Sequence, residues 1–514
     1  DSASGRPLGA GQIAVVGTRL GALTDSAGRY LVTNVPGGSY TVEARRLGYA
    51  PVSRAGVVVT PGATATLAIR MRGAALNLQA VVTTGVVDPT AGTRVPFTVG
   101  RVSAEQVPVP PTNAVEALAG RVAGATVIPG GQPGSGISVQ LRAPASISKS
   151  TQPLIVVDGV ILAETTDDPT ADLNALDIES VEVVKGAAAA SLYGSRAANG
   201  VLQIRTRRGG GLADGRTQVI ARSEFGANQI QNPIPFAQLN AFRVANGQYV
   251  DANGNPVSRA NRVLRPVQDR FQDSPFPGQT FDQNDEDLGA GQFGLHSATV
   301  SQNAGRTNFL ATLSRQTSTG VILDVGGYTR NDVRINLDHR LRDDFTLGFS
   351  SYYSRSTRSD LDEDLFFDLV NMAPDIDLTA RDSAGNLNFE PDPISRRPNP
   401  LYTIGTQDRR TKRNRFLGSA TARYAPTTWF SLDANASYDR GDRQSNFFLD
   451  RGARAIDQTF DRIGGLELAN AQTQAFNGAT TASLIGRRGD LTARASARAA
   501  LERENGNRFG YRGI

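Results

Sequence analysis

The residues of this chain that could bind a metal ion are oxygen ligands in two polar stretches: Asp251, Asn253 and Asn255 in one, and Asp360, Asp362 and Asp364 in the other. Carboxylate and amide oxygens are the ligands that calcium prefers. Neither stretch reproduces the spacing of a twelve-residue calcium-binding loop, so solvated loop acids are the favoured interpretation and calcium in these loops is the alternative. No other cofactor or metal is predicted.

Other site chemistry is restricted by composition. The 514 residues include no Cys and only two His, His296 and His339, which excludes thiolate nucleophiles and leaves little for zinc or a Ser/His/Asp relay. Paired carboxylates occur in the polar stretches, but nothing sets their separation, so a glycosidase is unsupported. Lys and Arg number 54 against 49 Asp and Glu, which argues against a nucleic-acid partner. We therefore predict that the chain is not an enzyme.

Arginines recur on one side of alternating runs in the last part of the chain, as in Val333, Ile335 and Leu337 against Arg334 and Asn336. Runs of about ten residues, apolar on one side and polar on the other, are typical of membrane barrels with a wet interior. We predict that the polar side faces this interior and that its arginines line it or hold something inside; they are Arg334, Arg340, Arg494 and Arg498. Arginine suits anionic or sugar-hydroxyl partners.

The connections between these runs support the same interpretation. Long connections at about 228–294, 355–412 and 440–472 alternate with turns of a few residues, as in barrels with long outer loops and short periplasmic turns. Five aromatic residues near run ends are predicted to lie at the membrane interfaces: Tyr352, Tyr353, Tyr424, Trp429 and Tyr438. We count about nine strands, whereas large membrane barrels with a filled interior have about 22, so we expect a truncated chain or half of a split barrel.

The first segment predicts a small β-sandwich. Its short β-runs are separated by turn residues such as Asp25 to Gly28 and Pro36 to Gly38. The expected strands are Ile13 to Val16, Gly28 to Thr33, Ser39 to Arg45, Gly56 to Val59 and Ala63 to Met71. Alternation in residues 40–45 buries one face only, which requires a second layer.

The second segment contains a dense succession of motifs. Asn113 is predicted to cap a helix with Val115, Leu118 and Val122 on one face. An apolar strand at Pro153 to Val157 ends at the turn Asp158-Gly159. Further motifs are DIESVEVVKG, which ends at Lys185-Gly186, and YGSRAANG, with Tyr193, Gly194, Arg196, Asn199 and Gly200. From the residues alone, the glycines and Asp158 are expected to serve turns and packing rather than ligand contact.

Taken in order, LAGRVAGATV, GQPGSGISVQLRAPASI, PLIVVDGV and DIESVEVVKGAAAASLYGSRAANGVLQIRT resemble the plug of SusC/RagA-family TonB-dependent outer-membrane transporters. The first segment resembles the carboxypeptidase-regulatory-like module that precedes many such receptors. The resemblance implies a mainly β chain: sandwich 1–75, TonB-box linker 76–90, α+β plug 91–211, and 212–514 as part of an antiparallel transmembrane β-barrel.

The resemblance also implies partners and a location. The TonB box corresponds to the β-prone run around Ala80, Val81, Val82, Thr83 and Thr84, which has no evident partner strand. The partners that the resemblance implies for the whole protein are TonB with the ExbB/ExbD motor, a SusD-like surface lipoprotein, outer-membrane lipid, and an oligosaccharide or peptide substrate. The implied location is the outer membrane of a Gram-negative bacterium, with the N-terminal domain periplasmic and the long loops extracellular.

Two alternatives stay open at this point. A docked linker strand explains residues 78 to 85 as well as a TonB contact does. Lys185 and Arg196 pair either with Glu179 and Glu182 inside the plug or with the barrel wall. At the level of function, the alternatives to import are a non-transporting surface or adhesion β-protein and a secreted carbohydrate-active enzyme.

Overall fold

The structure is a computed structural model that divides into two compact units, Asp1–Phe97 and Thr98–Ile514. The residues that it describes are 5–9, 11–18, 20–46, 52–71, 81–82, 90–91, 99–107, 113, 115–141, 151–163, 170–171, 173, 178–185, 189, 193, 195–212, 215–232, 235, 237–284, 288–362, 364–392, 397–455, 460–488 and 491–513. Each unit is described by itself below.

The first unit is built on a four-stranded antiparallel sheet in the order β2-β1-β3-β4. Its strands are β1 (Gln12–Val15), β2 (Gly21–Leu23), β3 (Gly38–Arg45) and β4 (Val52–Val59). Apolar side chains of β1 and β3 alternate toward one face, where Ile13, Val42 and Ala44 are buried. The predictions for these parts of the sheet are confirmed.

The predicted strands at Gly28 to Thr33 and Ala63 to Met71 are wrong. Both segments lie outside the strands of the described chain, yet Tyr30, Leu67 and Met71 belong to the same apolar cluster as Ile13 and Val42. The Tyr30 hydroxyl donates to the Leu67 carbonyl at 2.7 Å, which holds the two segments together. Alternation predicts which side chains are buried, but a ladder also needs a partner in register, which alternation does not specify.

The second unit contains a five-stranded sheet in the order β11-β10-β13-β12-β7. Its strands are β7 (Val99–Ser103), β10 (Leu154–Val157), β11 (Val160–Ile161), β12 (Ile178–Val184) and β13 (Val201–Thr206). β10 and β13 run parallel, and the other neighbours run antiparallel. A separate hairpin pairs β8 (Ala125–Pro129) with β9 (Ile137–Leu141). These strands follow the predicted motifs closely.

The predicted helix after Asn113 is only one turn long. It is the 3-10 helix η3 (Val115–Leu118), and the Asn113 side chain accepts from the Val115 amide at 2.9 Å. Val115 and Leu118 are fully buried, and Val122 packs in the same core. The predicted apolar face is therefore present, but Gly120 and Gly124 adopt positive φ and stop the helix.

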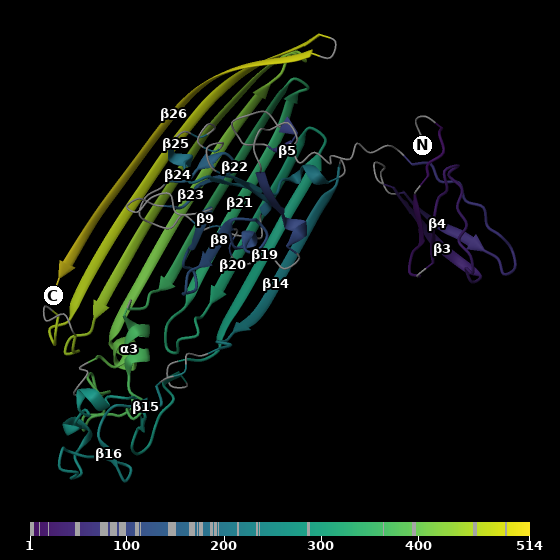
Figure 1. The fold of residues 1–514 in the computed structure, drawn as a ribbon. Helices are drawn as coiled ribbons and strands as arrows, with labels where there is room; N and C mark the ends of the chain where they lie inside the picture. The colour runs from purple at the N-terminus through teal and green to yellow at the C-terminus, as the bar shows by residue number, and fades with distance from the viewer. Residues whose placement is uncertain are drawn as a thin grey trace. The chain divides into compact units, whose positions relative to one another are not determined.

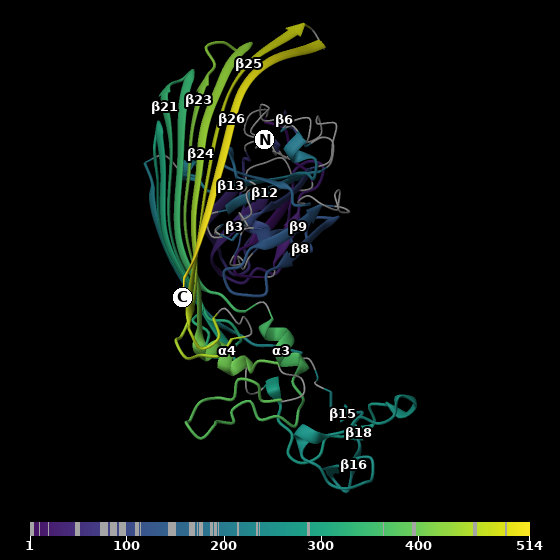
Figure 2. The ribbon, with the colours of Figure 1, turned by 90° about the vertical axis from the view of Figure 1, so that its left-hand side faces the viewer.

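The largest element is a nine-stranded antiparallel sheet whose strands follow one another in chain order (Figure 1). They are β14 (Thr217–Asn228), β19 (Gly291–Ala304), β20 (Thr307–Ser318), β21 (Tyr328–Arg342), β22 (Phe345–Ser359), β23 (Gln407–Tyr424), β24 (Phe430–Leu449), β25 (Gly465–Arg488) and β26 (Leu491–Gly513). β14 and β26 are its edges. Figure 2 shows the sheet curved along its length, and the smaller sheet with β12 and β13 lies on its concave side.

The two faces of this sheet differ as predicted. Along β21, Val333, Ile335 and Leu337 are exposed on the convex side, whereas Arg334 and Asn336 are buried against the five-stranded sheet. Successive side chains of a strand point to opposite faces, so the polar set faces inward. For the same reason Tyr352 and Tyr353 cannot share an interface. Tyr353 is exposed. Tyr352 is buried in the apolar core that the large sheet shares with the five-stranded sheet, which corrects its predicted place at the membrane interface.

The connections are unequal at the two ends of the sheet. At one end the strands join through 229–290, 319–327, 360–406 and 450–464, and at the other through 305–306, 343–344, 425–429 and 489–490. The long connections carry the helices α3 (Leu365–Asn371) and α4 (Pro400–Thr406). The predicted connection 440–472 is too long, because β24 continues to Leu449 and β25 begins at Gly465. No helix in the described part of the chain has the length and hydropathy to span a membrane.

Candidate functional site

The turn between β10 and β11 lies at the contact of the five-stranded sheet with the nine-stranded sheet and is hydrogen-bonded to both. Asp158 and Gly159 both have positive φ, the geometry that a two-residue hairpin turn needs. The Asp158 carboxylate accepts from the Thr206 amide at 3.0 Å and from the Ser350 hydroxyl at 3.2 Å, and Arg334 lies at 3.6 Å. The turn is thus held by one plug strand and by two strands of the large sheet.

Polar side chains of β21 and β22 extend this contact along the wall. Asn336 donates to the Thr206 hydroxyl at 3.0 Å and to the Arg207 carbonyl at 2.6 Å. The Arg334 guanidinium lies 4.5 Å from the centre of the Tyr352 ring, and the Tyr352 hydroxyl donates to Asp332 at 2.9 Å. Because these groups are buried and mutually hydrogen-bonded, they form a satisfied polar layer between the two sheets.

A second buried contact lies beside β11. Arg415 and Asp439 form a two-pronged ion pair, with distances of 2.8 and 3.2 Å, and the Asp439 side chain is fully buried. The same carboxylate accepts from the Ala163 amide at 3.0 Å. Asn477 donates to the Ile161 carbonyl at 3.5 Å. The strand β11 and the residues after it are thus bound by β23, β24 and β25.

The remaining plug motif residues lie apart from the hairpin. Arg196 forms ion pairs with Glu504 at 3.1 Å and Glu502 at 3.8 Å on β26, which places this pairing on the barrel wall. Lys185 donates to the Ala123 carbonyl inside the plug. Of the two partners considered inside the plug, Glu179 is exposed, and Glu182 is buried and lies 3.8 Å from Arg101.

Tyr193, Asn199 and Gly200 complete the described part of this motif. Burial raises the pKa of the Tyr193 phenol, with Arg498 of β26 acting in the opposite direction. The Asn199 amide donates to the Gln152 carbonyl at 3.4 Å. Gly200 has φ +98, and an added Cβ would lie 2.6 Å from Leu141, so the position requires glycine. Gly186 and Gly194 lie outside the described residues.

The linker prediction is corrected in one respect. Val81–Val82 (β5) pairs antiparallel with Thr90–Ala91 (β6), so this run has a partner within its own unit. The ladder is only two residues long, and short isolated hairpins are marginally stable. Ala80, Thr83 and Thr84 lie outside the described residues.

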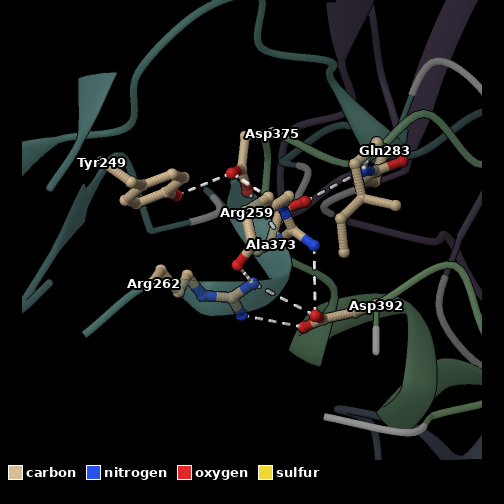
Figure 3. Close-up of polar contacts among 8 residues, drawn as sticks. Tyr249, Arg259, Arg262, Gln283, Ala373, Asp375 and Asp392 are labelled. Atoms are coloured by element: carbon tan, nitrogen blue, oxygen red, sulfur yellow. Dashed lines mark hydrogen bonds and ion pairs between the residues drawn. The ribbon is translucent and has the colours of Figure 1, made fainter. Parts of the chain in front are cut away.

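The long connections hold a network that the sequence analysis missed, shown in Figure 3. Arg259 binds Asp375 through two nitrogens at 2.8 Å each and Asp392 at 3.1 Å, and Arg262 also binds Asp392 at 3.1 Å. The Tyr249 hydroxyl donates to Asp375 at 2.7 Å; burial and this bond raise the pKa of Tyr249. The network joins 229–290 to 360–406, and only the i, i+3 spacing of the two arginines hinted at it.

Comparisons with known proteins agree with this geometry. Residues 92–201 match the TonB-dependent receptor plug domain, and residues 1–72 match the carboxypeptidase regulatory-like domain. TonB-dependent receptor P26 of Formosa agariphila is 28% identical over 463 residues, 87% of this chain and 43% of its own length. TonB-dependent receptor SusC of Bacteroides thetaiotaomicron is 41% identical over 103 residues, 19% of this chain and 10% of its own.

Among solved structures, the RagAB peptide importer in its closed-closed state has a TM-score of 0.60 at 18% identity, covering 81% of this chain and 52% of its own. The chain is thus similar to TonB-dependent receptors of the SusC/RagA type, with matches to their plug domain and to the carboxypeptidase regulatory-like domain. It spans less than half the length of the curated receptors P26 and SusC. These relatives are receptors and an importer rather than enzymes, in agreement with the prediction that the chain is not an enzyme.

The two oxygen-ligand stretches of this chain make local hydrogen bonds and ion pairs. The Asp251 carboxylate accepts from the amides of Asn253 and Asn255 at 2.8 and 2.9 Å, and these backbone bonds lower its pKa. Asp360 binds Arg358, and Asp362 binds Arg409. Groups of three or more His, Asp or Glu side chains placed for a metal ion are absent from the described residues. Calcium in the long connections stays a prediction.

Proposed function

We propose that the chain belongs to a TonB-dependent active transporter of the outer membrane that imports oligosaccharides or peptides. The observation that supports this most strongly is the two-faced sheet: its convex side is apolar, and its concave polar side binds a separate folded domain. A polar wall against a plug is what a gated pore requires, and an apolar outer face suits lipid. The long connections are then extracellular, and the N-terminal unit is periplasmic.

In this proposal TonB, driven by ExbB and ExbD, takes hold of the linker around Val81 and Val82. The ladder between β5 and β6 is only two residues long, so few backbone hydrogen bonds hold it. An incoming strand can therefore replace it at small cost. A SusD-like surface lipoprotein covers the long connections. The network of Arg259, Asp375 and Asp392 gives such a partner a fixed surface, because it holds two of these connections together.

Deletion of residues 78–85 in the intact receptor tests the proposal. We expect loss of substrate uptake with normal amounts of folded receptor in the outer membrane, measured by radiolabelled uptake and by surface labelling. Restoring residues 78–85 in the same strain is the control and should recover uptake. Uptake that persists without residues 78–85 contradicts the proposal and favours the surface-protein alternative.

A further inference from the structure

The convex face of the nine-stranded sheet changes from apolar to polar between two neighbouring rows of its register. One row of exposed apolar side chains runs across β20 to β23: Leu313, Val333, Tyr353 and Phe416. The next row on this face, two residues closer to the long connections, is polar: Arg315, Asn331, Arg355 and Asn414. Residues two apart on a strand are separated by about 7 Å, so the change occurs over the length of one side chain.

The cations of the polar row lie on the same side of the sheet as the apolar row. Arg315 and Arg355 are exposed, as are Leu313 and Tyr353 two residues before them. Lys412 is also exposed and lies one row closer to the long connections, where it pairs with Thr357 in the register. The name cationic belt is used below for five residues: Arg315, Asn331, Arg355, Lys412 and Asn414.

The positive charge of the cationic belt is not neutralised within the described part of the chain. No described carboxylate forms an ion pair with Arg315, Arg355 or Lys412. The carboxylates that share this face nearby are already paired on their own strands, Asp408 with Arg410 and Asp442 with Arg440, at 3.0 Å each.

The other end of the same strands is different. Arg306 and Arg342 are exposed there, but Arg306 lies 3.8 Å from Asp343 and Arg342 lies 3.2 Å from Asp344. In the described parts of β20 to β23, the outward-facing cations without a carboxylate partner thus lie at the long-connection end.

A cation directly beside a lipid-facing apolar row belongs at the level of the lipid headgroups. Arginine and lysine on the lipid face of a barrel are costly at the midplane of the bilayer and nearly free at its interfaces. Tyr353 marks the same level, because its ring lies in the apolar row and its hydroxyl donates to Asn414 at 3.3 Å, as suits an interfacial tyrosine.

We propose that the cationic belt binds the phosphate groups of a phosphorylated glycolipid in the membrane leaflet at the long-connection end. This inference rests on the outer-membrane location in the proposed function. A guanidinium fork binds phosphate through two parallel hydrogen bonds. The amides of Asn331 and Asn414 can donate to and accept from sugar hydroxyls, and the apolar row receives the acyl chains.

Displacement of a fluorescent lipid A from the purified intact protein in detergent micelles tests the cationic belt with three probes: lipid A with two phosphates, digalactosyldiacylglycerol without phosphate, and inorganic phosphate. We expect the phosphorylated lipid to bind at least about tenfold more tightly than the galactolipid, with affinity that falls as salt is raised. Equal binding of the two lipids overturns the proposal. Displacement by inorganic phosphate as effective as that by lipid A also overturns it, because the site would then not be a lipid site.

Variants locate the effect. Arg315→Gln combined with Arg355→Gln is expected to weaken binding of lipid A about tenfold or more, and Lys412→Gln alone should act in the same direction with a smaller effect. The control is Arg306→Gln combined with Arg342→Gln, which removes the same charge from the other end of the strands and should leave lipid binding unchanged. Unchanged binding of lipid A in the folded Arg315 and Arg355 double variant refutes the site.

Uptake in cells with and without TonB separates the two proposals, because lipid binding by the purified protein does not require TonB. A protein that prefers the phosphorylated lipid through Arg315 and Arg355 but takes up no oligosaccharide or peptide through TonB fails as a transporter and keeps its lipid site. TonB-dependent uptake without any preference for the phosphorylated lipid leaves the transporter intact and rejects the cationic belt as a lipid site.

Discussion

The plug is attached to the barrel wall in two chemically different ways. On the side of β10 and β11, Asp158, Arg334 and Asp439 are nearly or fully buried and hydrogen-bonded on several sides. On the other side, Arg196 meets Glu502 and Glu504, whose side chains are 44% and 28% exposed. Hydrogen bonds in a buried polar network strengthen one another, whereas exposed ion pairs are individually weak. The contact at Arg196 is therefore expected to be the weaker of the two.

The largest expected effect is at the buried side. Asp439→Ala removes the partner of Arg415 and the acceptor of the Ala163 amide, which leaves a buried guanidinium uncompensated. Breaking a buried pair in this way costs about 3 to 5 kcal/mol. We expect the denaturant midpoint of the purified protein to fall markedly. Asp408→Ala, which breaks the half-exposed pair with Arg410, is the control and should change the free energy of unfolding by about 0 to 1 kcal/mol.

A medium effect is expected at the hairpin turn. Asp158→Asn preserves a residue type that tolerates positive φ, so the turn itself survives. It removes the negative charge that faces Arg334 and weakens the bonds from Thr206 and Ser350, at a cost of about 1 to 3 kcal/mol. Asp158→Ala adds backbone strain, so it should be the more damaging of the two. Equal losses would show that the charge of Asp158, not the turn geometry, accounts for the whole effect.

The hairpin side of the plug could be predicted from the sequence better than the Arg196 side. Period-two alternation and turn dipeptides were enough to place β9 to β13, the inward position of Arg334 and the Asp158 turn. Alternation failed where the chain is extended but unpaired, as at Ala63 to Met71. It also could not choose between the plug's Glu179 and Glu182 and the barrel wall as the partner of Arg196. The bonds of Asp439 to Ala163, and of Arg259 to Asp375, join residues more than a hundred positions apart. Local patterns carry no information on such pairs.

The smallest effect is expected at Arg196. Arg196→Gln removes ion pairs that water and salt already screen, so the free energy of unfolding should fall by about 1 kcal/mol or less. High salt should erase the difference between this variant and the parent, while the loss caused by Asp439→Ala should persist, because buried pairs are screened much less. Hydrogen exchange of the plug amides distinguishes the two sides further: Arg196→Gln should speed exchange around 195–200 and leave 154–163 protected. Faster exchange at 154–163 in this variant would show that both sides of the plug open as one unit.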